Sequence, residues 1–278
     1  MGPGERGLKR LIVTADDFGA SANVNEAIEK AHLDGILTTA SLMVAAPEAA
    51  DAAARAKRLP GLRVGLHVVA VRGRPMLPAV EIPDLVDAAG ELDANLVRAG
   101  VRYFFLPHVR RQLAREIRAQ FEAFRATGLV LDHVNAHNHM HLHPSVLGLI
   151  LEIGREFGLK AVRLPFEPGS GALLAPWIGI MKRRLKAAGI ACNDYLFGIR
   201  DTGRMDAGRL KATIAGLPDG NSEVMLHPAT GPWDGMEPEA RGFRHADEFR
   251  ALLDPQVRRE VESGNIQLIG FSGLEPQT

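Results

Sequence analysis

The sequence predicts an α/β protein whose single domain is an irregular (β/α) barrel of seven or eight mainly parallel strands. Short apolar runs of strand length alternate with apolar residues at helical spacing along nearly the whole chain. Repeated strand–helix–strand order indicates a parallel sheet, and this many repeats suit a barrel better than an open sheet. The 278 residues, 46% of them hydrophobic, are enough for one domain spanning 1–278 to bury a sizeable core.

The first strand and helix show how each element is predicted. Residues 8–14 form a short apolar run that is typical of a buried strand. Ser21 then precedes apolar residues at positions 24, 27, 28 and 31, which share one helix face, and serine is a favourable N-cap. The same patterns predict further strands at residues 41–46, 64–71, 131–136, 161–164, 195–199, 223–226 and 266–271. Further helices are expected at residues 47–57, 144–157, 173–188, 209–215 and 247–262.

Residues 72–107 interrupt this alternation. The segment is rich in proline and glycine and carries scattered apolar residues. We therefore expect an inserted lid or substrate loop rather than a second domain. Its apolar residues fit contact with a lipid part of a substrate as well as simple packing against the barrel. Residues 166–171 form a second, shorter irregular stretch.

Composition argues against several classes of protein. The 33 basic and 33 acidic side chains balance, so there is no electrostatic reason to expect nucleic acid or an anionic membrane as a partner. The single cysteine, Cys192, cannot form an internal disulfide, which fits a reducing compartment. No apolar stretch approaches the roughly 18 residues of a transmembrane span, so we expect a cytoplasmic protein. The oligomeric state is left open, and a homodimer is compatible with the sequence.

Polar side chains recur where the predicted strands end. Asp16 and Asp17 follow the first strand, His67 lies in the third, Arg163 lies at the end of the fifth and His227 follows a late one. Because the C-terminal ends of parallel strands meet at one rim of a barrel, these residues are expected to converge. One aspartate and two histidines are a plausible ligand set for a catalytic divalent ion that keeps a position for water. Imidazole ligands favour zinc, cobalt, nickel or iron over magnesium.

The strongest bias follows the fourth predicted strand. Five histidines occur within residues 133–143, which is typical of metal-binding tracts, although a solvated histidine-rich loop is the alternative. His137 and His141 have the spacing that puts two imidazoles on one helix face. His137 and His139 would instead share a side in an extended segment. The spacing leaves both arrangements open.

Each candidate also has a purely structural interpretation. Asp16 and Asp17 could form a turn and cap the next helix. At a strand end, one carboxylate could instead bind a metal while the other acts on the water beside it. His67 could be a core histidine, and His227 a capping residue rather than a general acid. Arg163 could close a salt bridge, orient a catalytic carboxylate or bind substrate.

Four motifs resemble those of a known family. They are TADDFG at 14–19, GLH at 65–67, HNHMH at 137–141 and EVMLHP at 223–228. In order and spacing they resemble the YdjC-like, chitooligosaccharide deacetylase-type carbohydrate deacetylases over nearly the whole chain. Residues 21–46 and 193–204 are most similar to the hopanoid-biosynthesis-associated branch, which is believed to deacetylate an N-acetylglucosaminyl-hopanoid lipid. The resemblance implies a metal-dependent hydrolase on an irregular barrel like that of polysaccharide deacetylases.

The resemblance also implies a role for each matching residue. Asp17, His67 and His137 would hold one divalent metal ion, with zinc favoured by ligand type and magnesium, cobalt or nickel as alternatives. Asp16 would be the catalytic base, and His227 would protonate the leaving amine. Polysaccharide deacetylases take two ligands from one His-x-x-x-His element, a spacing that recurs here at 137 and 141, so the role of the second histidine is open. Substrate binding is expected of Arg163, His139 and His141.

The expected reaction removes the N-acetyl group from an N-acetylglucosamine-containing oligosaccharide or glycolipid, including an N-acetylglucosaminyl hopanoid. Other functions remain open on the same barrel. A metal-dependent sugar isomerase would usually have more carboxylates and a lysine at the strand ends, and Lys160 is the only lysine near one. A phosphoesterase would have two metals bridged by acids. A non-catalytic sugar-binding protein would leave the adjacent pair Asp16 and Asp17 unexplained.

Overall fold

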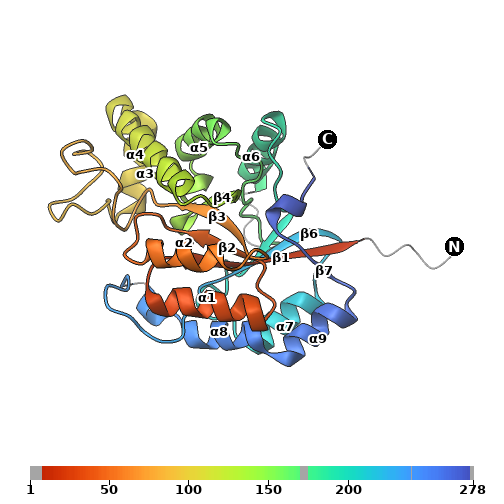
Figure 1. The fold of residues 1–278 in the computed structure, drawn as a ribbon. Helices are drawn as coiled ribbons and strands as arrows, with labels where there is room; N and C mark the ends of the chain where they lie inside the picture. The colour runs from red at the N-terminus through yellow and green to blue at the C-terminus, as the bar shows by residue number, and fades with distance from the viewer. Residues whose placement is uncertain (1–7, 170–174, 239, 276–278) are drawn as a thin grey trace.

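A curled, parallel β-sheet lies at the centre of the computed structural model, which describes residues 8–169, 175–238 and 240–275 (Figure 1). Its strand order is β4-β3-β2-β1-β6-β5. β7 lies off this path and pairs with the first half of β1, whereas β2 pairs with the second half. Every strand pair in the described part of the chain is parallel. The strands are β1 (Lys9–Phe18), β2 (Thr39–Leu42), β3 (Arg63–Val68), β4 (Leu131–Ala136), β5 (Tyr195–Phe197), β6 (Gly220–Leu226) and β7 (Gln267–Leu268).

The sheet confirms the predicted fold class but forms only part of a regular barrel. The predicted strand at 161–164 is reduced to isolated bridges, which join Val134 to Val162 and Ala161 to Ala191. These bridges extend the sheet beyond the edge of β4 without building a full strand there. The α/β architecture therefore has seven strands and a curled sheet, with short bridging segments where a regular barrel would have another strand.

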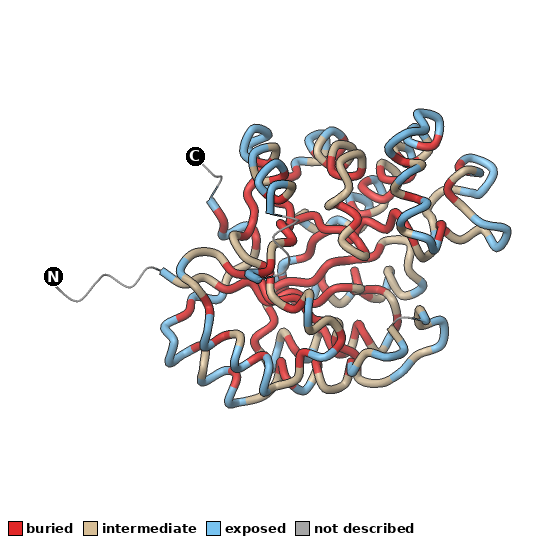
Figure 2. The backbone as a smooth tube through the Cα atoms, turned by 180° about the vertical axis from the view of Figure 1, so that it is seen from behind, coloured by how far each residue is buried: buried red, intermediate tan, exposed pale blue. Residues whose placement is uncertain are grey.

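Helices cover the sheet on two flanks (Figure 1). One flank carries α3 (Leu96–Phe105), α4 (Pro107–Ala126), α5 (Pro144–Glu156) and α6 (Ala175–Ala187). The other carries α1 (Ala22–Asp34), α2 (Ala49–Lys57), α7 (Ala207–Ala215), α8 (His245–Leu253) and α9 (Pro255–Ser263). Short 3-10 segments are η1 (His137–Leu142), η2 (Ala240–Gly242) and η3 (Phe271–Gly273). Burial is concentrated in the strands and on the inner helix faces, while the outer helix turns are exposed (Figure 2).

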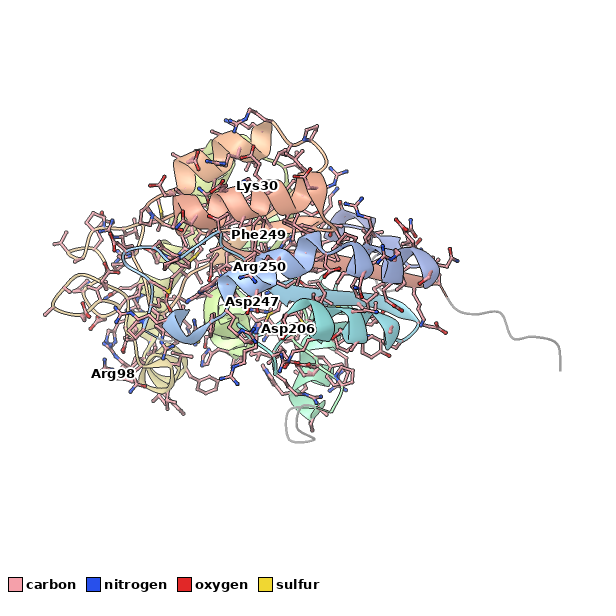
Figure 3. The ribbon with its side chains drawn as sticks, turned by 90° about the horizontal axis from the view of Figure 1, so that it is seen from below. Lys30, Arg98, Asp206, Asp247, Phe249 and Arg250 are labelled. Atoms are coloured by element: carbon pink, nitrogen blue, oxygen red, sulfur yellow. The ribbon has the colours of Figure 1, made fainter. Side chains whose placement is uncertain are left out.

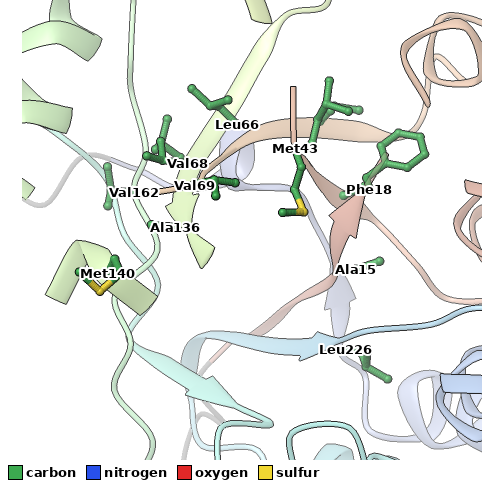
Figure 4. Close-up of a cluster of buried hydrophobic side chains, with 14 of the residues drawn as sticks. Ala15, Phe18, Met43, Leu66, Val68, Val69, Ala136, Met140, Val162 and Leu226 are labelled. Atoms are coloured by element: carbon green, nitrogen blue, oxygen red, sulfur yellow. The ribbon is translucent and has the colours of Figure 1, made fainter. Parts of the chain in front are cut away.

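Charged side chains lie on the outer surface, and apolar side chains fill most of the space between the helices and the sheet. Lys30 on α1 and the pair Asp247 and Arg250 on α8 lie on the outer side seen in Figure 3, the latter two 3.1 Å apart. Inside, Phe18 and Leu66 from neighbouring parts of the sheet are fully buried in an apolar cluster (Figure 4). None of the helices in the described part of the chain combines the length and apolar character that crossing a bilayer requires.

Most predicted elements are present, with revised ends. α1 begins after Ser21, whose hydroxyl accepts a hydrogen bond from the Val24 backbone at 3.2 Å, as predicted. The helix predicted at 247–262 is two helices, because Asp254 caps α9 and the following proline starts it. Positions 173–174 of the helix predicted at 173–188, and positions 170–171 of the second irregular stretch, lie outside the described residues.

Two helices were not predicted from the sequence. α3 lies inside the segment expected to be a lid, and α4 follows it directly. The buried face of α4 carries Val109, Leu113, Ile117 and Phe121 at four-residue spacing, a helical pattern that the sequence displays although the helix was not predicted. Glu116 and Gln120 lie on the same buried face. Both polar groups are hydrogen-bonded to backbone atoms of residues 69–77, which fastens the start of the irregular segment to α4. A lid function for residues 72–107 stays a prediction.

Candidate active site

A bulge in β1 brings two adjacent carboxylates to the same pocket. Between Ala15 and Phe18, β1 advances three residues while its partner β2 advances two. Asp17 takes the left-handed conformation, with φ of 63°, that such an irregularity allows. As a result, Asp16 and Asp17 both line one pocket instead of pointing to opposite sides of the sheet.

Asp17 in β1, His67 in β3 and His137 directly after β4 come together at one place. Asp17 Oδ1 lies 3.4 Å from His67 Nε2 and 3.3 Å from His137 Nδ1, and the two histidine nitrogens lie 3.4 Å apart. Ligand atoms held tetrahedrally at zinc distances of about 2.0–2.1 Å would lie about 3.3–3.4 Å apart. Among the described residues, no other group of three or more His, Cys, Asp or Glu side chains has ligand atoms that all lie within 4.8 Å of one another.

The chemistry of this group fits a divalent cation. Asp17 Oδ1 is buried and has no hydrogen-bond partner among the described residues, a costly state that a cation would relieve. Asp16 and Glu223 share the guanidinium of Arg163, whereas Asp17 contributes a further carboxylate beside the two histidine rings. The negative charge of Asp17 favours binding of a cation. The donor set of one carboxylate and two imidazoles suits zinc.

Asp16 is held by two partners on its other side. The Arg163 guanidinium donates to Asp16 Oδ2 at 2.6 Å and to Oδ1 at 3.0 Å, and the Asn135 amide donates to Oδ1 at 3.0 Å. Burial raises the pKa of Asp16, but the charge and hydrogen bonds of Arg163, together with the nearby rings of His67 and His227, outweigh burial and hold the pKa far below its usual range. Asp16 is therefore an ionised carboxylate of fixed orientation beside the three grouped side chains.

Arg163 lies behind the site rather than in its pocket. Its side chain has no exposed surface and bridges Asp16 and Glu223, with a contact of 2.6 Å to each. Glu223 also accepts a hydrogen bond from the Thr14 hydroxyl at 2.7 Å. Of the roles considered for Arg163, this geometry favours orientation of a carboxylate; it does not favour the expected contact with substrate.

His137 has a partner on each side of its ring. Its Nδ1 faces Asp17, and its Nε2 lies 3.0 Å from Oε1 of Glu237, a residue of the loop before α8. Burial lowers the pKa of His137, but the two carboxylates outweigh burial and raise the pKa to about 10. A carboxylate on the outer nitrogen is a common way to orient a metal-binding histidine.

The histidine tract at residues 137–141 is neither a regular α-helix nor an extended segment, the two arrangements that its spacing left open. After His137 the chain turns, with Asn138 and His139 both in the left-handed conformation at φ of 52° and 53°. His139 lines the pocket, whereas His141 is fully buried and lies outside the pocket lining. Burial lowers the pKa of His139 to about 3 and that of His141 well below its usual range. Substrate contact through His139 remains open, but this structure gives no such contact to His141.

The pocket has a volume of about 720 Å³ and combines the site with apolar walls. His227 follows β6 and lines it, with a buried Nδ1 that has no hydrogen-bond partner among the described residues. Arg72 lines the rim from the irregular segment after β3. Four of the five non-glycine residues with positive φ in the described chain line this pocket: Asp17, Arg72, Asn138 and His139. Such backbone conformations are typical of functional sites.

Three residues of the site were not assigned a role from the sequence. Asn135 alternates with His133 and His137 along β4, so the two-residue period of a strand could have indicated it. Glu223 lies in β6 and is the first residue of the EVMLHP motif, in which only His227 was given a role. Glu237 comes from a loop, where no periodicity applies.

Comparison with known proteins gives consistent matches along the chain. A family model described as YdjC-like protein matches residues 10–263. A carbohydrate deacetylase of Brevibacillus brevis is 30% identical over 268 residues, covering 95% of this chain and 99% of the relative. A carbohydrate deacetylase of Vibrio cholerae is 35% identical over 273 residues, covering 95% and 96%.

One solved structure supports the fold independently. A protein from Enterococcus faecalis, provisionally described as a cellobiose-phosphate cleavage protein, superposes with a TM-score of 0.76. The alignment covers 95% of this chain and 98% of that protein, at 21% sequence identity. At this identity the likeness bears on the architecture of the chain.

Proposed function

The chain belongs to the YdjC-like protein family, as its four motifs predicted, and from this premise we propose that it is a metal-dependent carbohydrate deacetylase. The observation that carries the proposal is the close group of Asp17, His67 and His137 directly beside the ionised carboxylate of Asp16. The curated deacetylases that match the chain along its length support the same reaction class. The proposed reaction is hydrolysis of the N-acetyl group of an amino sugar.

Asp17, His67 and His137 are proposed to hold one divalent cation, with zinc favoured by the ligand types. Such an ion polarises an amide carbonyl and lowers the pKa of water, which addresses the poor electrophilicity of the amide. The three side chains come from β1, β3 and the end of β4, so the sheet fixes their relative positions.

Asp16 is proposed to take the proton of the attacking water. Arg163 and Asn135 donate hydrogen bonds to the Asp16 carboxylate and keep it ionised and oriented. Because Asp16 and Asp17 are adjacent but differ in their partners, one carboxylate can accept a proton while the other serves as a ligand.

His227 is proposed to protonate the leaving amine. It lies on the pocket wall after β6, and its buried Nδ1 makes no hydrogen bond within the described chain. An imidazole can exchange a proton near neutral pH, and an amine leaves far more readily once its nitrogen is protonated.

The substrate is proposed to be an N-acetylglucosamine conjugate. The pocket offers polar groups at its base and apolar side chains on its walls, including Met43, Val69 and Met236. Trp233 also lines the pocket and offers a flat face on which a sugar ring can stack. These walls suit a glycolipid as well as an oligosaccharide, and an N-acetylglucosaminyl hopanoid stays a prediction.

Acetate release tests the proposal directly. Purified protein is incubated with soluble chitooligosaccharides and with N-acetylglucosaminyl lipids, with and without a chelator and after zinc is restored. We expect chelator-sensitive acetate release that zinc restores. Phosphate release or aldose–ketose conversion from the same sugars would favour the phosphoesterase or isomerase alternatives, and binding without turnover would favour a sugar-binding protein.

A further inference from the structure

We infer that Asn135 is a positioning residue for His67. The charge of Asp16 orients the Asn135 amide, and the amide determines which ring nitrogen of His67 carries the hydrogen. Asn135 lies on β4, has no exposed surface and touches both side chains. Its Oδ1 lies 2.7 Å from His67 Nδ1, while its Nδ2 donates to Asp16 Oδ1 at 3.0 Å. A single amide therefore joins the proposed base to a proposed metal ligand.

Hydrogen-bond chemistry determines the orientation of this amide. An ionised carboxylate can only accept, so the NH₂ group of Asn135 must face Asp16. The carbonyl oxygen of Asn135 then faces His67 Nδ1 and can only accept, so that nitrogen must carry the hydrogen. In a neutral imidazole, the other nitrogen then bears the lone pair. That nitrogen, Nε2, is the one that faces Asp17 and His137.

A second contact prevents the amide from turning over. The remaining N–H of Asn135 donates to the Ser41 hydroxyl at 2.9 Å. Ser41 Oγ lies 3.1 Å from His133 Nε2, and His133 Nδ1 lies 3.1 Å from Asp132 Oδ2. Donors and acceptors match along this line when Ser41 donates to His133 and His133 donates to Asp132.

All members of this line are buried. Ser41, His133 and Asn135 have no exposed surface, and Asp132 is 5% exposed. A turned amide would place its oxygen against Asp16 and its NH₂ group against His67 Nδ1, leaving buried groups mispaired. The network thus holds His67 ready with its lone pair toward the metal position, as outer partners of metal-binding histidines do.

The inference rests on the proposed function only in taking His67 as a metal ligand, and the test separates the two. The ¹⁵N shifts of the His67 ring are recorded in the metal-free protein at mildly alkaline pH, and His67→Gln assigns the signals. We expect a protonated Nδ1 and an unprotonated Nε2. A protonated Nε2 in the wild-type protein would overturn the inference, whether or not the protein binds zinc.

Variants then test Asn135 itself by calorimetric zinc titration and the same spectra. Asn135→Leu is expected to mix the two His67 tautomers and to weaken zinc binding about 10–100-fold. Asn135→Asp keeps an acceptor for His67 Nδ1 but places a second carboxyl group beside Asp16, so we expect one of the two to be protonated and the His67 tautomer to be retained. Asn135→Asp also keeps the test valid if the leucine variant does not fold.

Asn193 provides the matched control. It too has no exposed surface, but within the described part of the chain it hydrogen-bonds only backbone atoms of Leu164 and Tyr195. Asn193→Leu is expected to lower stability and to leave the His67 tautomer and the zinc affinity unchanged. Equal effects of Asn135→Leu and Asn193→Leu on the two readouts would contradict a specific role for Asn135. A wild-type protein that shows the expected tautomer but binds no zinc would contradict the proposed function alone.

Discussion

Arg163 donates two hydrogen bonds to the carboxylate of Asp16, at 2.6 and 3.0 Å, although the residues are 147 positions apart in the chain. Neither side chain exposes more than 3% of its surface. The pair explains how a carboxylate in an apolar interior stays ionised, because the nearby guanidinium is the largest of the effects that outweigh the cost of burial. The pair also fixes the orientation of the Asp16 carboxylate, so that Oδ1 faces the Asn135 amide.

Replacing the proposed base should separate catalysis from metal binding. Asp16→Asn keeps the shape of the side chain and removes its ability to accept a proton. We expect kcat for acetate release at saturating zinc to fall about 10²–10⁴-fold, with zinc still bound. Kinetics and calorimetry measure the two quantities. Near-wild-type turnover would refute the assigned role of Asp16.

Removing the buried guanidinium should be costly for folding. Arg163→Met leaves Asp16 and Glu223 as buried carboxylates without their cation. We expect a loss of about 3–5 kcal/mol in the free energy of unfolding, measured by denaturant titration. Arg118→Met is the control, because Arg118 pairs with Glu156 on the surface and should change stability little. Equal effects of the two substitutions would contradict this account of Arg163.

Glu237 should strengthen metal binding from outside the ligand group. Glu237→Gln removes the negative charge that lies 3.0 Å from the outer nitrogen of His137. We expect zinc affinity to fall about 10–100-fold, since such outer partners orient the ligand and increase its basicity. Asp234→Asn, at another acidic position of the same pocket, should have a smaller effect. An unchanged affinity in Glu237→Gln would argue against this contact.

Acid should weaken the attachment of the C-terminal segment. Asp132 accepts backbone hydrogen bonds from Phe271 at 3.1 Å and Ser272 at 2.9 Å, and His133 lies beside it. Burial raises the pKa of Asp132, but these partners outweigh burial and lower it from its ordinary value of 3.8. The ionised form is therefore favoured in the folded protein. Its stabilisation is present above about pH 3.8 and is lost as the pH falls through the lower folded-state pKa.

Comparing unfolding free energies of wild type and Asp132→Asn across acidic pH tests this linkage. We expect a cost of about 1.5–3 kcal/mol at neutral pH that shrinks as the solution becomes acidic. A difference that is constant with pH would show that the charge of Asp132 does not contribute.

The sequence predicted the α/β class and most strands, because these depend on local patterns that a chain displays directly. The three residues of the metal group were predicted through the family resemblance. Apolar runs marked the strands, and the strand ends marked where Asp16, Asp17 and His67 would meet. The bulge in β1 was not predicted, since it depends on pairing with a neighbouring strand. α4 was not predicted, although its buried apolar residues have regular helical spacing in the sequence.

The partners of the site residues were harder to predict than the residues themselves. Arg163 was identified as a site residue, but only the folded chain reveals that Asp16 and Glu223 enclose it. Glu237 approaches His137 from a loop, a contact that depends entirely on tertiary structure. The family resemblance thus named the proposed ligands, whereas their orientation depends on contacts between distant segments.

Anomalous X-ray diffraction at the zinc absorption edge, from crystals of the protein grown with zinc, tests the metal centre most directly. The account predicts one strong peak about 2.0–2.2 Å from Asp17 Oδ1, His67 Nε2 and His137 Nδ1 together. A peak held by other side chains, or no peak at these three atoms in zinc-saturated crystals, would contradict it.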